Sequence, residues 1–231
     1  MANSIDVRSG ALTRAEPFLA STIGKKVVMA VTGVVLVGFV VAHMIGNLTA
    51  YLGPEAMNAY AVWLRELMHG AALWIMRAGL LLSVILHIWA AVSLTLDNRR
   101  ARPIGYRSRD FERSTYASRT MVWSGPILLL FIVYHLLHFT TGDIHPAFVE
   151  GEVYQNFVTG FRVPAVSLFY ILSMLALGLH LYHGIWSMLQ TLGLSHPRYN
   201  FLRHGMAGLF TAIVVVGNIS FPLAVLFGVI R

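Results

Sequence analysis

Five long stretches of the 231-residue chain are almost free of charged side chains, and this feature limits the possible folds more than any other. They cover residues 27–45, 71–96, 121–139, 164–194 and 206–230. At a rise of about 1.5 Å per residue, each is long enough to cross the apolar layer of a membrane as an α-helix. Charged residues make up 12% of the chain, against about 25% in soluble domains. The sequence therefore predicts an all-α protein, a transmembrane bundle of five helices.

The segments between these stretches are more polar. Residues 1–26 are expected to form an N-terminal cytoplasmic or interfacial segment, and residues 27–231 a single transmembrane domain. The segment 47–70 is amphipathic and predicts a loop with a short interfacial helix, whereas 97–119, 140–162 and 195–204 are expected to be loops. Pro126 predicts a kink in the third helix.

The basic residues are distributed unevenly among these segments. Of the 17 Lys and Arg, thirteen fall in segments 1–26, 97–119 and 195–204, which five alternating spans bring to one side of the membrane. By the positive-inside rule, we expect the N-terminus inside and the C-terminus outside. The membrane is expected to be the inner (cytoplasmic) membrane of the cell. The same topology accounts for the net charge of +7, so we expect no nucleic-acid partner.

Histidines lie deep within four of the apolar stretches. An ionisable side chain in hydrocarbon is costly and indicates a functional site, unless it is a hydrogen-bonded packing residue. His43 and His135 lie about 24 Å and 20 Å along their helices from the inner ends, in the outer half. His87 lies about 14 Å from its inner end, and His180 and His183 about 18 Å and 14 Å from theirs. The depths predict an outer pair, His43 with His135, and an inner pair, His87 with either His180 or His183.

Two alternatives within these pairs stay open on depth and local pattern. Depth favours His183 as the inner partner. The local pattern favours His180, because Gly184 follows one turn later and leaves room for a flat cofactor. His138 lies one turn beyond His135 on the same helix face and competes with it for the outer pair.

Two pairs of imidazoles on four helices predict two haems of the b type. We expect His43, His87, His135 and either His180 or His183 to bind the two irons as axial ligands. Zinc is less suitable, because its structural sites need four clustered ligands. An iron with both axial positions filled serves electron transfer rather than oxygen chemistry. The chain has no cysteine, which excludes Cys-ligated iron–sulfur clusters and covalent c-type haem from it.

Haem propionates need cationic or hydrogen-bonding partners. Arg77 and Arg162 are the candidates at the outer side, although Arg77 also fits a side chain that extends to the membrane interface. The inner candidates are Lys26, Ser118 and Arg119.

A quinone site needs hydrogen-bond donors, a titratable group and an aromatic wall. Two regions have this chemistry, and the sequence does not choose between them. The outer one is 63–69, with Arg65 and Glu66. The inner one contains Trp123, His183 and Trp186.

Several motifs, in order, resemble one known family. They are Gly24-Lys25-Lys26 leading to Thr32-Gly33, Ala42-His43, His87, Tyr134-His135 and His180-Leu-Tyr-His-Gly-Ile-Trp186. Over essentially its whole length the chain is similar to the membrane cytochrome b subunit of succinate dehydrogenase and fumarate reductase, in its single-chain, five-helix, diheme form. In that family the ligand is the histidine four residues before the glycine, which here selects His180.

The resemblance implies a membrane-anchor subunit of respiratory complex II, which serves the tricarboxylic acid cycle. A flavoprotein subunit and an iron–sulfur subunit would dock on its cytoplasmic face, and membrane lipid would surround it. Electrons would pass from succinate through two b haems to a quinone, with menaquinone preferred. The chain itself would hold no succinate-oxidising site. The alternatives are the cytochrome b of another quinone-linked dehydrogenase, such as a hydrogenase or formate dehydrogenase, and a non-redox membrane anchor or transporter.

Overall fold

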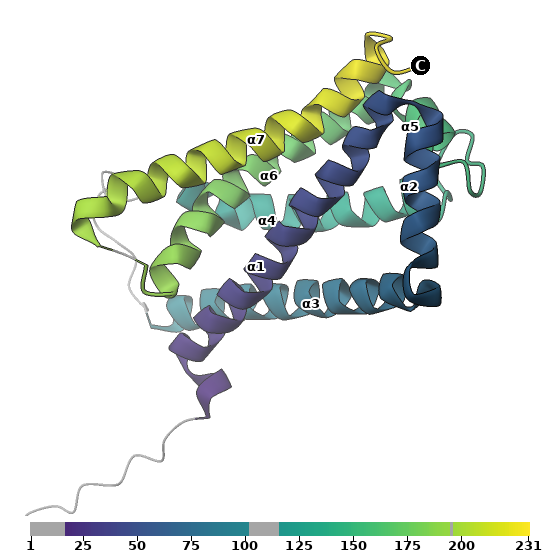
Figure 1. Ribbon diagram of the computed structural model, residues 1–231. Helices are drawn as coiled ribbons and strands as arrows, with labels where there is room; N and C mark the ends of the chain where they lie inside the picture. The colour runs from purple at the N-terminus through teal and green to yellow at the C-terminus, as the bar shows by residue number, and fades with distance from the viewer. Residues whose placement is uncertain (1–16, 102–115, 195) are drawn as a thin grey trace, which may run out of the picture.

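The computed structural model describes residues 17–101, 116–194 and 196–231, and the regular secondary structure of these residues is all helical, with no strand among them (Figure 1). Five helices are long and apolar enough to cross a membrane, as the sequence predicts, and they mark the chain as a multi-pass membrane protein. They are α1 (Thr22–Asn47), α3 (Ala71–Arg100), α4 (Tyr116–His135), α6 (Pro164–Thr191) and α7 (Asn200–Leu226). Most of the predicted N-terminal segment, 1–16, lies outside the described residues.

The shorter elements lie between these helices. The predicted interfacial helix in 47–70 is confirmed as α2 (Pro54–Glu66), flanked by the 3₁₀ turns Leu48–Leu52 and Leu67–Gly70. Residues 140–162 contain a helix, α5 (Val153–Phe161), that the sequence interpretation missed. Its residues Phe157, Val158 and Phe161 are buried, so tertiary packing stabilises a helix too short to stand out in the hydropathy pattern. Helix α4 continues through Pro126 as one helix, and a single π-helical turn, Leu136–Thr140, follows it.

Among the boundaries that differ from the hydropathy pattern are the starts of α1 and α7. Helix α1 begins at Thr22, before the apolar stretch, because the Ser21 side chain accepts a hydrogen bond from the Gly24 amide and caps the helix. Helix α7 begins at Asn200, so the predicted loop 195–204 is wrong over its second half. Arg203 is thus a helical residue and not a loop residue.

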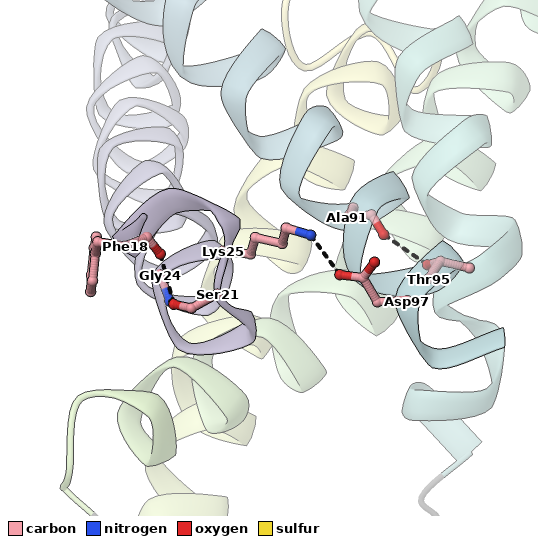
Figure 2. A network of polar contacts seen from close by, with 7 residues as sticks. All are labelled: Phe18, Ser21, Gly24, Lys25, Ala91, Thr95 and Asp97. Carbon is pink, nitrogen blue, oxygen red and sulfur yellow. Dashed lines mark hydrogen bonds and ion pairs between the residues drawn. The ribbon is translucent and has the colours of Figure 1, made fainter. Parts of the chain in front are cut away.

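An ion pair joins the start of α1 to the end of α3. Lys25 Nζ lies 2.6 Å from Asp97 Oδ2 (Figure 2). Along their length, α1 packs on α3, α4 packs on α6, and α6 packs on α7. In Figure 1, α1 crosses the other long helices diagonally, while α2, α5 and the C-terminus gather at one end of the bundle.

The close-packed hydrophobic core lies at that end. It combines the end of α1 with α2, α5, the start of α6 and the end of α7, and includes Met44, Met57, Phe157, Tyr170 and Phe221. Large apolar side chains elsewhere point outward along all five spans, for example Trp74, Leu130, Leu172 and Val216. Such a surface suits hydrocarbon rather than water.

Candidate functional site

Four long helices bring four imidazoles together in two pairs. The ring centroids of His43 on α1 and His135 on α4 are 5.7 Å apart. Those of His87 on α3 and His180 on α6 are 6.2 Å apart. These are the two pairs that the helix depths predicted, with His180 rather than His183 opposite His87.

Each imidazole of the inner pair has one nitrogen beside a hydroxyl group. His87 Nδ1 lies 3.1 Å from Thr32 Oγ1, and this hydroxyl donates to the Val28 carbonyl at 2.7 Å. The hydroxyl therefore accepts the Nδ1–H of His87, which leaves the lone pair on Nε2 free. His180 Nδ1 has the corresponding position 3.3 Å from Ser124 Oγ. A metal-binding histidine is commonly oriented in this way by a partner on its other nitrogen.

The outer pair is held by aromatic residues. His135 Nδ1 lies 3.2 Å from the Tyr170 hydroxyl, and Phe131 packs beside the His135 ring. The His43 ring stacks on Phe39, with centroids 5.3 Å apart and planes inclined by 18°. The Tyr170 hydroxyl thus orients the His135 ring, although it also lies 3.1 Å from Nδ1 of His138.

His138, the competitor of His135, faces a different group of residues. It is fully buried, with Nδ1 3.1 Å from the Tyr170 hydroxyl and its ring stacked on His145 at 4.8 Å. His145 is half-buried, and its Nε2 lies 2.8 Å from the Asn156 carbonyl oxygen. Among the described ring contacts, His138 has none with His43, whereas His135 does.

The spacing of both pairs fits a metal ion between the rings. Two imidazoles bound on opposite sides of one metal, at about 2.0 Å each, place their ring centroids about 6 Å apart. In the described part of the chain, no three His, Cys, Asp or Glu side chains form a metal-binding group. A zinc site takes three or four such protein ligands, whereas a bis-histidine haem takes only two.

The surroundings of the imidazoles also leave room for a flat cofactor. His43 is exposed and the other three rings are only half-buried. Among the described residues, neither α1 with α4 nor α3 with α6 is a helix pair with extensive backbone contact. A Cβ built on Gly184, one turn beyond His180, would meet no atom within 4 Å. Each pair therefore spans helices that do not close on each other directly.

The remaining predicted cofactor-binding residues have other described contacts. Arg77 is exposed, with its guanidinium 5.0 Å from the centre of the Trp74 ring, and Arg162 is an exposed residue at the end of α5. His183 packs on Trp186 with ring centroids 5.7 Å apart. Among the inner propionate candidates, Lys26 and Arg119 are exposed, and the side chain of Ser118 lies outside the described part.

Sequence reasoning assigned no role to Ser124, Tyr170 or the Thr32 hydroxyl. The sequence does show that these hydroxyl groups lie inside apolar stretches. Without water there, a hydroxyl group needs a hydrogen-bond partner within the protein, as a histidine does. Which partner it has depends on the rotation of each helix about its axis, and hydropathy does not report that rotation.

Comparisons with protein-family models, with curated proteins and with solved structures found no match. The geometry of the two histidine pairs, together with the sequence motifs, therefore carries the functional argument.

Proposed function

We propose that this chain is the diheme cytochrome b subunit that anchors a succinate:quinone oxidoreductase in the membrane. The observation that carries the proposal is the presence of two His–His pairs on four apolar helices, with centroids 5.7 Å and 6.2 Å apart. A packing role explains one buried histidine well. It does not explain two facing pairs with a hydroxyl group beside Nδ1 in each.

His43 and His135 would hold one haem b, and His87 and His180 the other. When bound, the haems would supply one-electron transfer between the two halves of the membrane. Thr32 and Ser124 orient the rings of His87 and His180 through Nδ1, so that Nε2 of each ring would be the nitrogen available to the metal. Tyr170 has the same task for His135.

The chain's own residues also set the protonation state of the ligands. With its proton on the Val28 carbonyl, Thr32 Oγ1 accepts a hydrogen bond from His87 Nδ1. The proton of His87 is thereby held on Nδ1, on the side away from the metal. The hydrocarbon layer around these apolar helices would keep bulk water from the imidazoles.

The uneven distribution of Lys and Arg supports an orientation with the N-terminus inside. His87 and His180 would then lie nearer the cytoplasmic side, where a flavoprotein and an iron–sulfur subunit would dock. Electrons from succinate would enter there and reach a membrane quinone, preferably menaquinone. The protein would belong to the inner membrane of the cell.

Single alanine substitutions test the ligand assignment. We expect each of His43→Ala, His87→Ala, His135→Ala and His180→Ala to reduce the haem content from two to one per chain, because an iron loses an axial ligand. Variants within a pair should lose the same component of the reduced-minus-oxidised spectrum. The control, His183→Ala, should keep both haems. Loss of a haem in His183→Ala with both retained in His180→Ala would contradict the assignment.

The electron donor is tested on the protein purified with its native partner subunits. We expect succinate to reduce the b haems that dithionite reduces, and a menaquinone analogue to reoxidise them. Reduction by hydrogen or formate but not by succinate would identify a different dehydrogenase. Spectra that lack b-type bands in folded protein would exclude the electron-transfer function altogether.

The absence of cysteine makes the orientation directly testable. Asn98→Cys and Glu150→Cys each introduce one thiol at an exposed position, on opposite sides of the proposed membrane. We expect a membrane-impermeant maleimide to label Glu150→Cys in intact spheroplasts, and Asn98→Cys only in inverted vesicles. The reverse labelling pattern would invert the proposed topology.

A further inference from the structure

A second group of polar residues lies where α6 and α7 meet, beyond His180 along α6. The described part of the chain has seven buried side-chain polar atoms without a hydrogen-bond partner, and five of them belong to this group. They are His183 Nδ1, Trp186 Nε1, Asn200 Oδ1, Arg203 Nε and Arg203 Nη1. Because buried polar groups are normally satisfied, such a concentration indicates a ligand site.

Arg203 and Trp186 form the centre of this group. The Arg203 guanidinium lies 5.2 Å from the centre of the Trp186 ring. Trp186 also contacts the rings of His183, at 5.7 Å, and His204, at 5.2 Å. Nδ1 of His204 lies 3.2 Å from the Tyr182 hydroxyl, so this nitrogen already has a hydrogen-bond partner. The unsatisfied donors of Arg203 and Trp186 are on neighbouring side chains.

Arg203 is a buried charged residue that needs a counterion. It is only 8% exposed and carries a permanent positive charge. In the described residues the one ion pair joins Lys25 to Asp97, and no carboxylate of this part of the chain reaches Arg203. A buried charge without a counterion is strongly unfavourable, and the stacked Trp186 ring offsets only part of that cost. The site therefore suits an anion.

The position of the group along α6 indicates which anion it would bind. Trp186 is six residues beyond His180, about 9 Å along the helix, and His183 lies between them. The group thus adjoins the inner histidine pair and lies toward the end of α6. The planar guanidinium matches both oxygens of a carboxylate, and the indole N–H adds a third donor.

We infer that Arg203, assisted by Trp186, binds a propionate carboxylate of the haem held by His87 and His180. This inference rests on the proposed function. It replaces Lys26 and Arg119, both exposed, as the anchor at the inner end. His183 and Asn200 complete the polar wall. Asn200 can present its NH₂ group instead of its oxygen by a turn of the amide.

The test compares Arg203→Gln with Arg198→Gln. The control removes the same charge from an exposed arginine that stacks on Tyr199 nearby. Transfer of haem to excess apomyoglobin reports the dissociation rate of each haem, and redox titration reports each midpoint potential. The inner haem is the spectral component that His87→Ala removes.

In Arg203→Gln we expect the inner haem to dissociate about tenfold faster or more, because a charge-assisted pair is lost. Its midpoint potential should shift downward, since an unpaired propionate opposes the addition of an electron. The outer haem should stay unchanged. Arg203→Lys should fall between wild type and Arg203→Gln, because it keeps the charge without the planar fork. Arg198→Gln should match wild type.

An unchanged rate and potential of the inner haem in Arg203→Gln would overturn the inference and leave the proposed function standing. So would native mass spectrometry in which this variant loses a bound anionic phospholipid and keeps both haems unaltered. A wild-type protein without haem would instead remove the proposed function itself. If Arg203→Gln also loses the outer haem and so fails to fold, Trp186→Phe replaces it. That variant should release the inner haem about threefold faster, and an unchanged rate would overturn the inference.

Discussion

The arrangement of the two histidine pairs depends on the hydrogen bonds that an imidazole needs inside hydrocarbon. Each ring has two nitrogens, and no water is present in the apolar layer to satisfy them. A hydroxyl group satisfies Nδ1 of His87, His135 and His180, through Thr32, Tyr170 and Ser124. Nε2 is then the nitrogen left for a ligand. The hydroxyl partners thus orient three of the four rings, while the His43 ring stacks on Phe39.

The bundle has a closely packed end and a middle in which fewer helices contact one another. Met44, Phe157, Tyr170 and Phe221 belong to a core that fixes the ends of several helices at one side of the protein. The helices then diverge between pairs, so that α1 stays with α3 and α4 stays with α6. The histidine pairs bridge these two halves. In the proposed holoprotein, the cofactors supply the contacts between helices that do not pack directly.

Helix number and histidine pairing could be predicted from sequence, because both depend on quantities that a sequence contains. Apolar length defines a span, and the 1.5 Å rise converts residue number into depth. The choice between His180 and His183 needs the helix rotation, which depth does not give. The start of α7 was misplaced because hydropathy marks where residues are apolar and not where backbone hydrogen bonds end. Arg203 was therefore assigned to a loop, although it is buried on a helix.

The central claim is that the four paired histidines bind two haems. It is tested most directly by a pyridine haemochrome assay on the purified wild-type protein, with the protein concentration determined by amino-acid analysis. The account predicts two b haems per chain. One haem per chain would mean that only one of the two pairs binds iron. Folded protein with no haem would contradict the account and return the four histidines to a packing role.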